Sequence, residues 1–275
     1  MLELVLMALL GFAVGAYGTV IGAGGGFILV PLLLFIFPSY GPEKVTAISL
    51  AVVWANATSG SIAYARQRRI DYVTGALFAV SALPGVVGGA LLVHLVPERA
   101  FSLMFGLLLL AIVIVLLLHP QATTVREPLA GRGLVVRTIV TKEGVTYRYA
   151  YPAWQVVALS LAVGFASSLF GIGGGVIHVP AMIVLFHIPV SFAVATSHFI
   201  LACMAAGGTA VHLANGTLSG RALEQAVALG LGAVVGAQAG AWLSHRLSGQ
   251  AVLRLLALAL VALAARLLLK GAFDI

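Results

Sequence analysis

The fold is decided by a glycine-rich stretch that occurs twice in the chain. The first copy reads Gly22-Ala23-Gly24-Gly25-Gly26-Phe27-Ile28-Leu29-Val30-Pro31, and the second reads Gly171-Ile172-Gly173-Gly174-Gly175-Val176-Ile177-His178-Val179-Pro180. Each copy interrupts a long apolar segment. Because glycine is the poorest helix former after proline, each copy predicts a broken helix. Broken backbone inside a membrane must face protein or a water-filled cavity, and paired breaks in two halves are typical of a transporter binding site.

The composition is that of a membrane protein. Of the 275 residues, 61% are hydrophobic and only 8% are charged, and the mean hydropathy is +1.13. Soluble domains carry about 25% charged residues. The sequence therefore predicts an all-α polytopic membrane protein, and membrane orientation explains the net charge of +7 better than nucleic-acid binding does. The single cysteine, Cys203, excludes an internal disulfide and a cysteine-rich metal site.

All eight acidic residues lie in or beside the expected loops and termini. They are Glu3, Glu43, Asp71, Glu98, Glu127, Glu143, Glu224 and Asp274. A carboxylate-based cation site or proton relay within the membrane is therefore not expected.

The chain contains eight apolar blocks, four on each side of a polar middle segment. They cover residues 2–37, 45–65, 73–96, 100–118, 154–187, 191–214, 222–244 and 250–270. The first block of each half would form a helix of roughly 50 Å, whereas the bilayer core is about 30 Å thick. Each overlong block is therefore predicted to be a span followed by a short second helix, either re-entrant or crossing. The prediction is about eight transmembrane segments, or ten if both blocks cross twice.

The two halves are related by an internal duplication. Gly22 corresponds to Gly171, Ser49 corresponds to Ser197, and the offset stays at 148–149 residues along the chain. The predicted organisation is a first transmembrane repeat (1–118), a cytoplasmic linker (119–153) and a second transmembrane repeat (154–275). In the linker, residues 134–140 and 145–151 are rich in Val, Thr and Tyr, which is typical of a β-hairpin.

Basic residues indicate the orientation. Eight of the fifteen Lys and Arg lie in two segments, residues 66–71 and 119–153, which are separated by two spans and so share one side. The positive-inside rule makes that side cytoplasmic and makes the protein a multi-pass protein of the cytoplasmic (inner) membrane. With eight spans the repeats are parallel and both termini are cytoplasmic; with ten the repeats are inverted and both termini lie outside.

The doubled G-x-G-G-G motif ending in V-P resembles the sulfite exporter TauE/SafE family. So do the two Ala-x-Ser elements that end at Ser49 and Ser197 and the segment Tyr64-x-Arg66 … Ile70-Asp71. The resemblance covers nearly the whole chain and least of all the middle segment. It implies a membrane transporter that exports sulfite, sulfonates or related small anions and has no prosthetic group.

The breaks suit an anion. The first turn after a break offers unpaired N–H groups and the positive end of a helix dipole, and glycine admits close approach. Neutral donors on the following blocks would let an anion leave again. The predicted substrate-binding residues are Gly22, Gly24, Gly25, Gly26, Ser49, Asn56, Gly171, Gly173, Gly174, Gly175, Ser197 and His198. The alternative is that the glycines only allow close helix packing and that each polar side chain forms a helix–helix hydrogen bond.

Histidine is the only obvious mid-membrane group that titrates near neutrality. His178, His198 and His212 lie in the second half, and each is a candidate for proton coupling, although a neutral, hydrogen-bonded histidine is the alternative. No H-x-x-H or H-x-x-x-H spacing occurs, so no metal site is expected. The predicted function is a secondary carrier that exports a small sulfur-containing anion, with proton coupling as a hypothesis; a passive anion channel is the alternative. The expected partners are the small anion and the bilayer, and both monomer and homodimer stay open.

Overall fold

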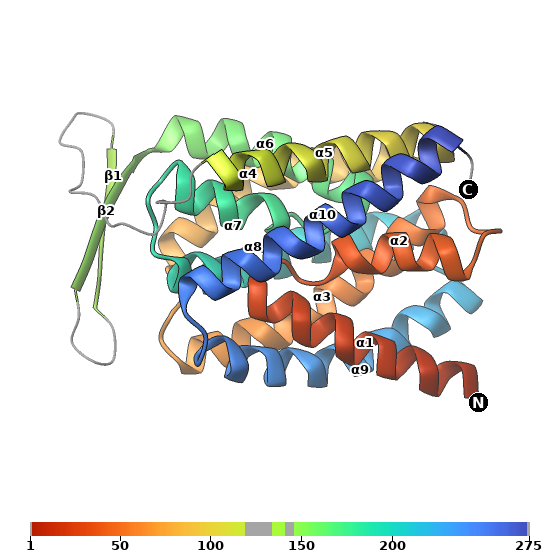
Figure 1. Ribbon diagram of the computed structural model, residues 1–275, viewed down its shortest axis with the longest axis horizontal. Coiled ribbons are helices and arrows are strands. Elements are labelled where there is room, and N and C mark those ends of the chain that lie inside the picture. The colour runs from red at the N-terminus through yellow and green to blue at the C-terminus, as the bar shows by residue number, and fades with distance from the viewer. Residues whose placement is uncertain (1, 119–133, 141–145, 274–275) are drawn as a thin grey trace.

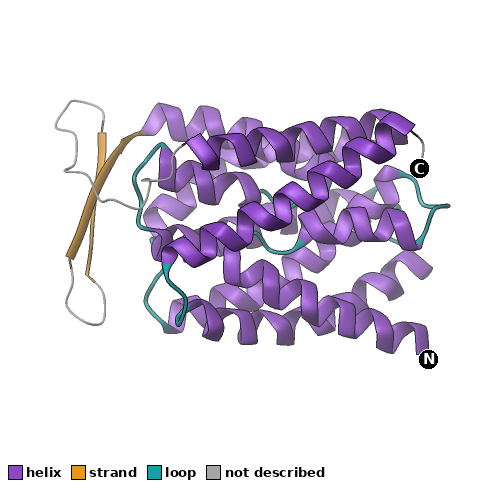
Figure 2. Cartoon of the chain, viewed as in Figure 1, coloured by secondary structure: helices purple, strands orange, loops and turns teal. Residues whose placement is uncertain are grey.

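The computed structural model describes residues 2–118, 134–140 and 146–273, which are almost entirely helical (Figures 1 and 2). The elements of the first half are α1 (Leu2–Ile21), α2 (Gly26–Ile36), α3 (Pro42–Arg66), α4 (Tyr72–Leu92), the 3-10 turn η1 (Val93–Leu95) and α5 (Glu98–Leu118). Those of the second half are α6 (Ala153–Phe170), α7 (Gly175–Val184), α8 (Val190–Ala214), α9 (Arg221–Ser244) and α10 (Gly249–Phe273). Eight of these helices are long and apolar enough to cross a membrane, which confirms the predicted fold class.

Both glycine motifs break a helix, as predicted. The first lies between α1 and α2 and the second between α6 and α7. Gly24 and Gly25 have φ of 71° and 84°, and Gly173 and Gly174 have φ of 76° and 88°. Side chains other than glycine rarely adopt this left-handed conformation. The chain can therefore reverse direction at each motif within a few residues.

Each broken block enters and leaves at one end of the bundle. Leu2 and Leu6 near the start of α1 line the same groove as Ile36 and Phe37 at the end of α2. In the second half, Tyr151 just before α6 packs on Phe186 just after α7, with ring centroids 5.6 Å apart. The helices α2 and α7 are too short to cross a bilayer core of about 30 Å at 1.5 Å per residue.

The two halves consequently have opposite orientations. In Figure 1 the N-terminal end of α1 and the C-terminal end of α10 lie at one side of the bundle, and the hairpin lies at the other. This is the inverted arrangement, and the parallel arrangement that goes with single crossings is wrong. The inversion is reached with eight long helices and two short ones, not with the ten spans that the sequence connected with it. The equivalent pairs pack alike, because α1 lies on α9 as α6 lies on α4, and α3 lies on α8.

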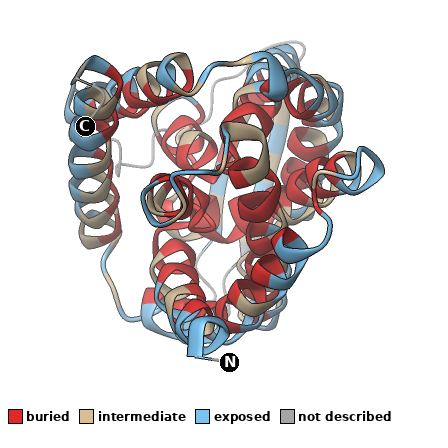
Figure 3. Ribbon diagram, turned by 90° about the vertical axis from the view of Figure 1, so that its right-hand side faces the viewer, coloured by how far each residue is buried: buried red, intermediate tan, exposed pale blue. Residues whose placement is uncertain are grey.

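The centre of the bundle is formed by α3 and α8, the most buried of the long helices. Figure 3 shows buried residues gathered on the central helices, whereas the helix that ends at the C-terminus is mostly exposed or intermediate. Small residues allow the close packing: a Cβ at Gly232 of α9 would lie 1.8 Å from the carbonyl oxygen of Ala8 on α1.

The predicted hairpin is present in the middle segment. Strands β1 (Leu134–Val140) and β2 (Thr146–Pro152) pair antiparallel, from Leu134 opposite Pro152 to Val140 opposite Thr146. The rest of the predicted linker, residues 119–133 and 141–145, lies outside the described residues. The hairpin packs at the same end as residues 67–71, as the basic residues predict.

Candidate functional site

The two glycine breaks meet in the middle of the protein. A Cβ at Gly26 would lie 2.6 Å from the carbonyl oxygen of Gly171, and one at Gly175 would lie 2.4 Å from that of Gly22. Atoms at these separations would overlap, so this contact requires glycine. Residues 22–26 and 171–175 are all buried. The structure thus brings the predicted glycines of both halves together at one place.

Two equivalent serines join the breaks across the halves. The Ser49 hydroxyl on α3 donates to the carbonyl oxygen of Gly171 at 2.6 Å, and the Ser197 hydroxyl on α8 donates to that of Gly22 at 2.9 Å. Each serine therefore satisfies a carbonyl that the broken helix cannot pair. Both hydroxyl protons are used in this way, so an anion at the breaks would not receive hydrogen bonds from these serines without a rearrangement.

Only some of the predicted glycine amides lack a backbone acceptor. The amides of Gly22 and Gly24 donate to the carbonyls of Thr19 and Gly18, at 3.2 and 3.1 Å, and that of Gly171 donates to Ser167. Within the described part of the chain, five of the predicted glycines have amides that donate to no backbone carbonyl. They are Gly25, Gly26, Gly173, Gly174 and Gly175.

These free amides stand at the N-terminal ends of α2 and α7. The two short helices come from opposite ends of the bundle, so their positive dipole ends converge where the breaks meet. No Asp or Glu lies between residues 4 and 42 or between 144 and 223. The helix dipoles at the breaks therefore favour an anion, and the segments that form the breaks carry no acidic residue.

An apolar pair closes the centre. Val53 on α3 and Leu201 on α8 are equivalent in the repeat, are completely buried and belong to a small cluster with Leu50, Ala57 and Ala205. A Cβ at Gly24 would lie 2.4 Å from Cδ2 of Leu201, and a Cβ at Gly173 would lie 2.4 Å from Cγ1 of Val53. We name Val53 and Leu201 the central plug, because they fill the space in front of both breaks. Sequence reasoning missed them, since apolar residues in apolar helices give no signal.

The predicted residues Asn56 and His198 belong to one buried network. The Asn56 side-chain amide donates to the carbonyl oxygens of Gly15 and Ala233 at 3.0 and 3.2 Å. Its Oδ1 lies 3.1 Å from the hydroxyl of Thr19, which lies 3.3 Å from Nε2 of His198. Thr19 is a further residue that sequence reasoning missed, since a lone threonine near a helix end carries no distinctive pattern.

The single hydroxyl proton of Thr19 has two possible acceptors, Oδ1 of Asn56 and Nε2 of His198. Nδ1 of His198 lies 3.3 Å from the carbonyl oxygen of Val194, so this nitrogen needs its own proton to form a hydrogen bond. A proton on Nε2 would then direct the Thr19 hydroxyl toward Asn56, and its loss would draw the hydroxyl back. The protonation state of His198 is thereby linked to Asn56 through one hydroxyl.

His178 and His212 have different surroundings. His178 on α7 packs edge-on against Phe78, with ring centroids 5.3 Å apart, and His212 lies near the end of α8. Neither ring has a hydrogen-bond partner within the described ranges. Among those residues no group of three His, Cys, Asp or Glu could hold a metal. The structure therefore links one predicted histidine, His198, to a hydrogen-bonded network that reaches another predicted residue.

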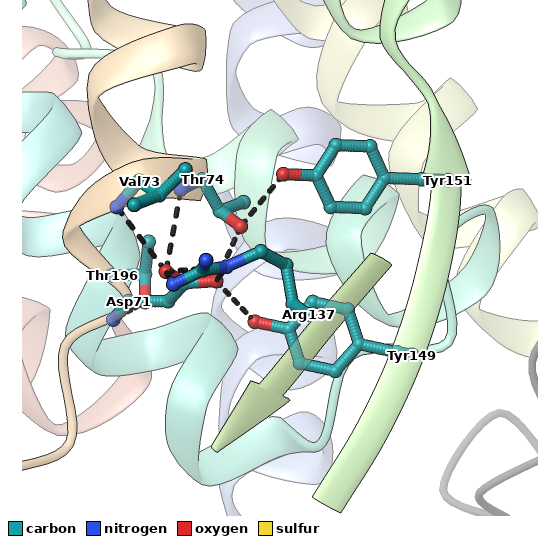
Figure 4. Close-up of polar contacts among 7 residues, drawn as sticks. All are labelled: Asp71, Val73, Thr74, Arg137, Tyr149, Tyr151 and Thr196. Atoms are coloured by element: carbon teal, nitrogen blue, oxygen red, sulfur yellow. Dashed lines mark hydrogen bonds and ion pairs between the residues drawn. The ribbon is translucent and has the colours of Figure 1, made fainter. Parts of the chain in front are cut away.

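A second polar cluster, which we name the Asp71 clamp, holds the hairpin against the bundle (Figure 4). The Asp71 side chain is completely buried and accepts hydrogen bonds from Arg137 at 2.8 Å and from the Tyr149 hydroxyl at 2.6 Å. It also accepts a hydrogen bond from the Thr74 hydroxyl. Because that proton is used, the Tyr151 hydroxyl, 2.7 Å away, donates to Thr74. Four side chains from α4 and both strands thus converge on one carboxylate or its direct partner.

Asp71 also connects the two halves. Its carboxylate caps α4 by accepting from the amides of Val73 and Thr74, and its own amide donates to the Thr196 hydroxyl on α8 at 3.0 Å. The hairpin adds the contact of Tyr147 with Phe192, at a centroid separation of 5.6 Å. The clamp therefore ties the α3–α4 loop to α8 at the hairpin end of the bundle.

The charge state of the clamp follows from its contacts. Burial by itself raises the pKa of Asp71, but the hydrogen bonds from Arg137, Thr74 and Tyr149, together with the Arg137 charge, outweigh it, so the pKa lies below its ordinary value. Burial, and then the hydrogen bond to Asp71, raise the pKa of Tyr149. Asp71 is therefore ionised and Tyr149 is protonated at neutral pH. The sequence analysis placed Asp71 among the acidic residues of the loops and gave it no partner. Its partner Arg137 is 66 residues away, so no local pattern could have predicted the ion pair.

The fold and the site define the class of this protein. Two inverted helical halves whose broken helices meet at a buried centre are the architecture of secondary membrane transporters. The chain belongs to the sulfite exporter TauE/SafE family, and the sequence model of this family matches residues 7–267.

Several relatives are named as transporters. The chain is 31% identical to "Probable membrane transporter protein YunE" of Bacillus subtilis, over 99% of this chain and 100% of the relative. It is 27% identical to a "Probable membrane transporter protein" of Methanocaldococcus jannaschii, over 79% of this chain and 75% of the relative. A Xylella fastidiosa protein of the same description is 31% identical over 69% and 64% of the two chains. No solved structure matches the chain.

Proposed function

We propose that this protein is a secondary carrier that exports small sulfur-containing anions, such as sulfite or sulfonates, across the cytoplasmic membrane. The observation that carries the proposal is the meeting of the two glycine breaks, with free amides of Gly25, Gly26 and Gly173–Gly175 at converging helix ends. Backbone N–H groups select a ligand by its negative charge and its size, which suits a small oxyanion.

The proposed site is occluded by the central plug. Val53 and Leu201 would have to move away before an anion could reach the amides of Gly26 and Gly175, which lie beside them. Relative movement of the inverted halves around a fixed site is how such carriers expose the site to one side at a time. The Asp71 clamp joins the halves at the hairpin end, which we assign to the cytoplasm. Opening of the site to the cytoplasm therefore requires that contacts of the clamp break.

Proton coupling, in this proposal, passes through His198. Protonation of Nε2 would turn the Thr19 hydroxyl toward Asn56, whose amide holds α1 and α9 through the carbonyls of Gly15 and Ala233. A proton on His198 would in this way change the bonds between helices of the two halves. The contacts of His178 and His212 offer no comparable path.

The test is a proteoliposome uptake screen of sulfite, sulfate, thiosulfate and small sulfonates, with and without an imposed proton gradient. Accumulation of one of these anions against its own gradient supports a coupled carrier. Movement only down its gradient favours the second candidate, a passive channel of the same fold. If none of these anions moves while another solute does, the proposed substrate class is wrong.

A further inference from the structure

A pocket of about 510 Å³ lies between α2, α5 and α10, away from the glycine breaks. Apolar side chains of Pro31, Leu34, Phe35 and Leu267 line part of it. Pro38 also lines it. The polar and charged lining residues are Glu98, Arg99, Ser102, Arg266 and Lys270.

We propose that this pocket binds the phosphate group of an anionic phospholipid, with an acyl chain along its apolar side. The pocket carries three cations and one carboxylate, and Lys270 already pairs with Glu98 at 2.7 Å. Arg99 donates from Nε to the carbonyl oxygen of Gly271 at 3.0 Å, and its terminal nitrogens have no acceptor among the residues that the structure describes. A guanidinium matches a phosphate with two parallel hydrogen bonds.

Arg266 supplies the second cation. Its guanidinium lies over the ring of Phe35, 4.5 Å from the centroid, and it has no carboxylate partner among residues 2–118, 134–140 and 146–273. Two guanidinium groups that pair with no carboxylate of the described residues thus line one pocket. Basic pockets between transmembrane helices are one known kind of lipid headgroup site. This pocket lies at the end of the bundle opposite the hairpin.

Ser102 gives an independent indication of a ligand. Its side chain is completely buried in the wall of the pocket, and its Oγ has no hydrogen-bond partner in the described part of the chain. A buried hydroxyl without a partner is costly, so a polar ligand atom in the pocket would satisfy it. A phosphate oxygen held by Arg99 and Arg266 is such an atom.

A lipid fits this pocket better than a free anion because the pocket opens on the lipid-facing side. Phe35, which lines the pocket, is 67% exposed. Among the long helices α10 is the least buried, so its outer face lies against acyl chains. The apolar wall formed by Leu34 and Leu267 offers no hydrogen bonds to a small hydrated anion, whereas it can pack against the first part of an acyl chain.

The test is native mass spectrometry of the purified full-length protein, titrated with phosphatidylglycerol and with phosphatidylcholine. We expect the wild-type protein to prefer phosphatidylglycerol, and the Arg99→Gln/Arg266→Gln variant to bind it roughly 30-fold more weakly. Ser102→Ala should weaken binding by a smaller factor. The matched control is Arg254→Gln, an exposed arginine on α10 outside the pocket, which should keep the wild-type preference.

Unchanged phosphatidylglycerol binding by the double variant would overturn the proposal. Equal binding of the two lipids by the wild-type protein would do the same. Displacement of phosphatidylglycerol by inorganic phosphate at equal concentration would assign the pocket to a free anion instead. The thermal unfolding midpoint of each variant shows whether a loss of binding reflects the pocket or the fold.

Discussion

Replacement of Gly173 by alanine should destabilise the protein in two separable ways. Gly173 has φ of 76°, and a Cβ there would lie 2.4 Å from Cγ1 of Val53. Gly216 provides a matched control, because its φ is 75° but a Cβ there would meet nothing within 4 Å. Gly216→Ala therefore carries only the backbone cost, and Gly173→Ala carries that cost plus the overlap with the central plug.

The magnitudes follow from these two contributions. A left-handed alanine costs about 1–2 kcal/mol, which applies to both variants. Overpacking of a close-packed core costs about 1–3 kcal/mol, which applies to Gly173→Ala alone. For a chain of this size the extra cost corresponds to an unfolding midpoint lower by roughly 2–10 °C than that of Gly216→Ala.

The assay is thermal unfolding of detergent-purified variants, followed by tryptophan fluorescence. A double-mutant cycle identifies the overlapping atom, because Val53→Ala removes the Cγ1 that the new methyl group would meet. We expect the double variant Gly173→Ala/Val53→Ala to be about 1–3 kcal/mol more stable than the sum of the single effects predicts. If Gly173→Ala is no less stable than Gly216→Ala, or if the cycle shows no coupling, the reasoning about the central plug is refuted.

Three further predictions concern the clamp, the network and the plug. Asp71→Asn should destabilise the protein by about 3 kcal/mol, since it leaves Arg137 without its buried partner, and calorimetry of the purified variant measures this. The pKa of Asp71 is lowered in the folded state, so the clamp's contribution to the free energy of unfolding is fully present above about pH 3.9 and is lost as the pH falls through the lowered pKa. Asp71→Asn should abolish this loss of stability in acid. His198→Gln should flatten the pH dependence of anion transport in proteoliposomes, and an unchanged profile would remove His198 from the proposal. Leu201→Ala should cost about 2–5 kcal/mol of stability and increase passive anion leak, whereas an unchanged leak would show that Leu201 does not close the site.

The sequence was most informative where the signal is local. The runs of glycine, the excess length of the first apolar blocks and the Val, Thr and Tyr content of residues 134–140 and 145–151 are all local features of the chain. The structure has the predicted elements at these places. The inverted orientation was left open, because the basic residues near the ends of the chain did not favour either arrangement. The contacts between the start and the end of each broken block decide it.

The parts that escaped prediction depend on contacts distant in sequence. Val53 and Leu201 are ordinary apolar residues in apolar helices, and only their place in front of both breaks gives them a role. The ion pair of Asp71 with Arg137 joins a loop to a hairpin 66 residues away. The predicted donors Ser49 and Ser197 turn out to bond to backbone carbonyls of the opposite half, which single-residue reasoning cannot foresee.

The central claim is that both breaks together form one anion site. Anomalous diffraction from crystals soaked in selenite, an analogue of sulfite whose selenium atom can be located directly, tests it. The account predicts an anomalous peak within hydrogen-bond distance of amides from both motifs, Gly25–Gly26 and Gly173–Gly175. A peak bound to one motif alone, or peaks only elsewhere on the protein, would contradict it.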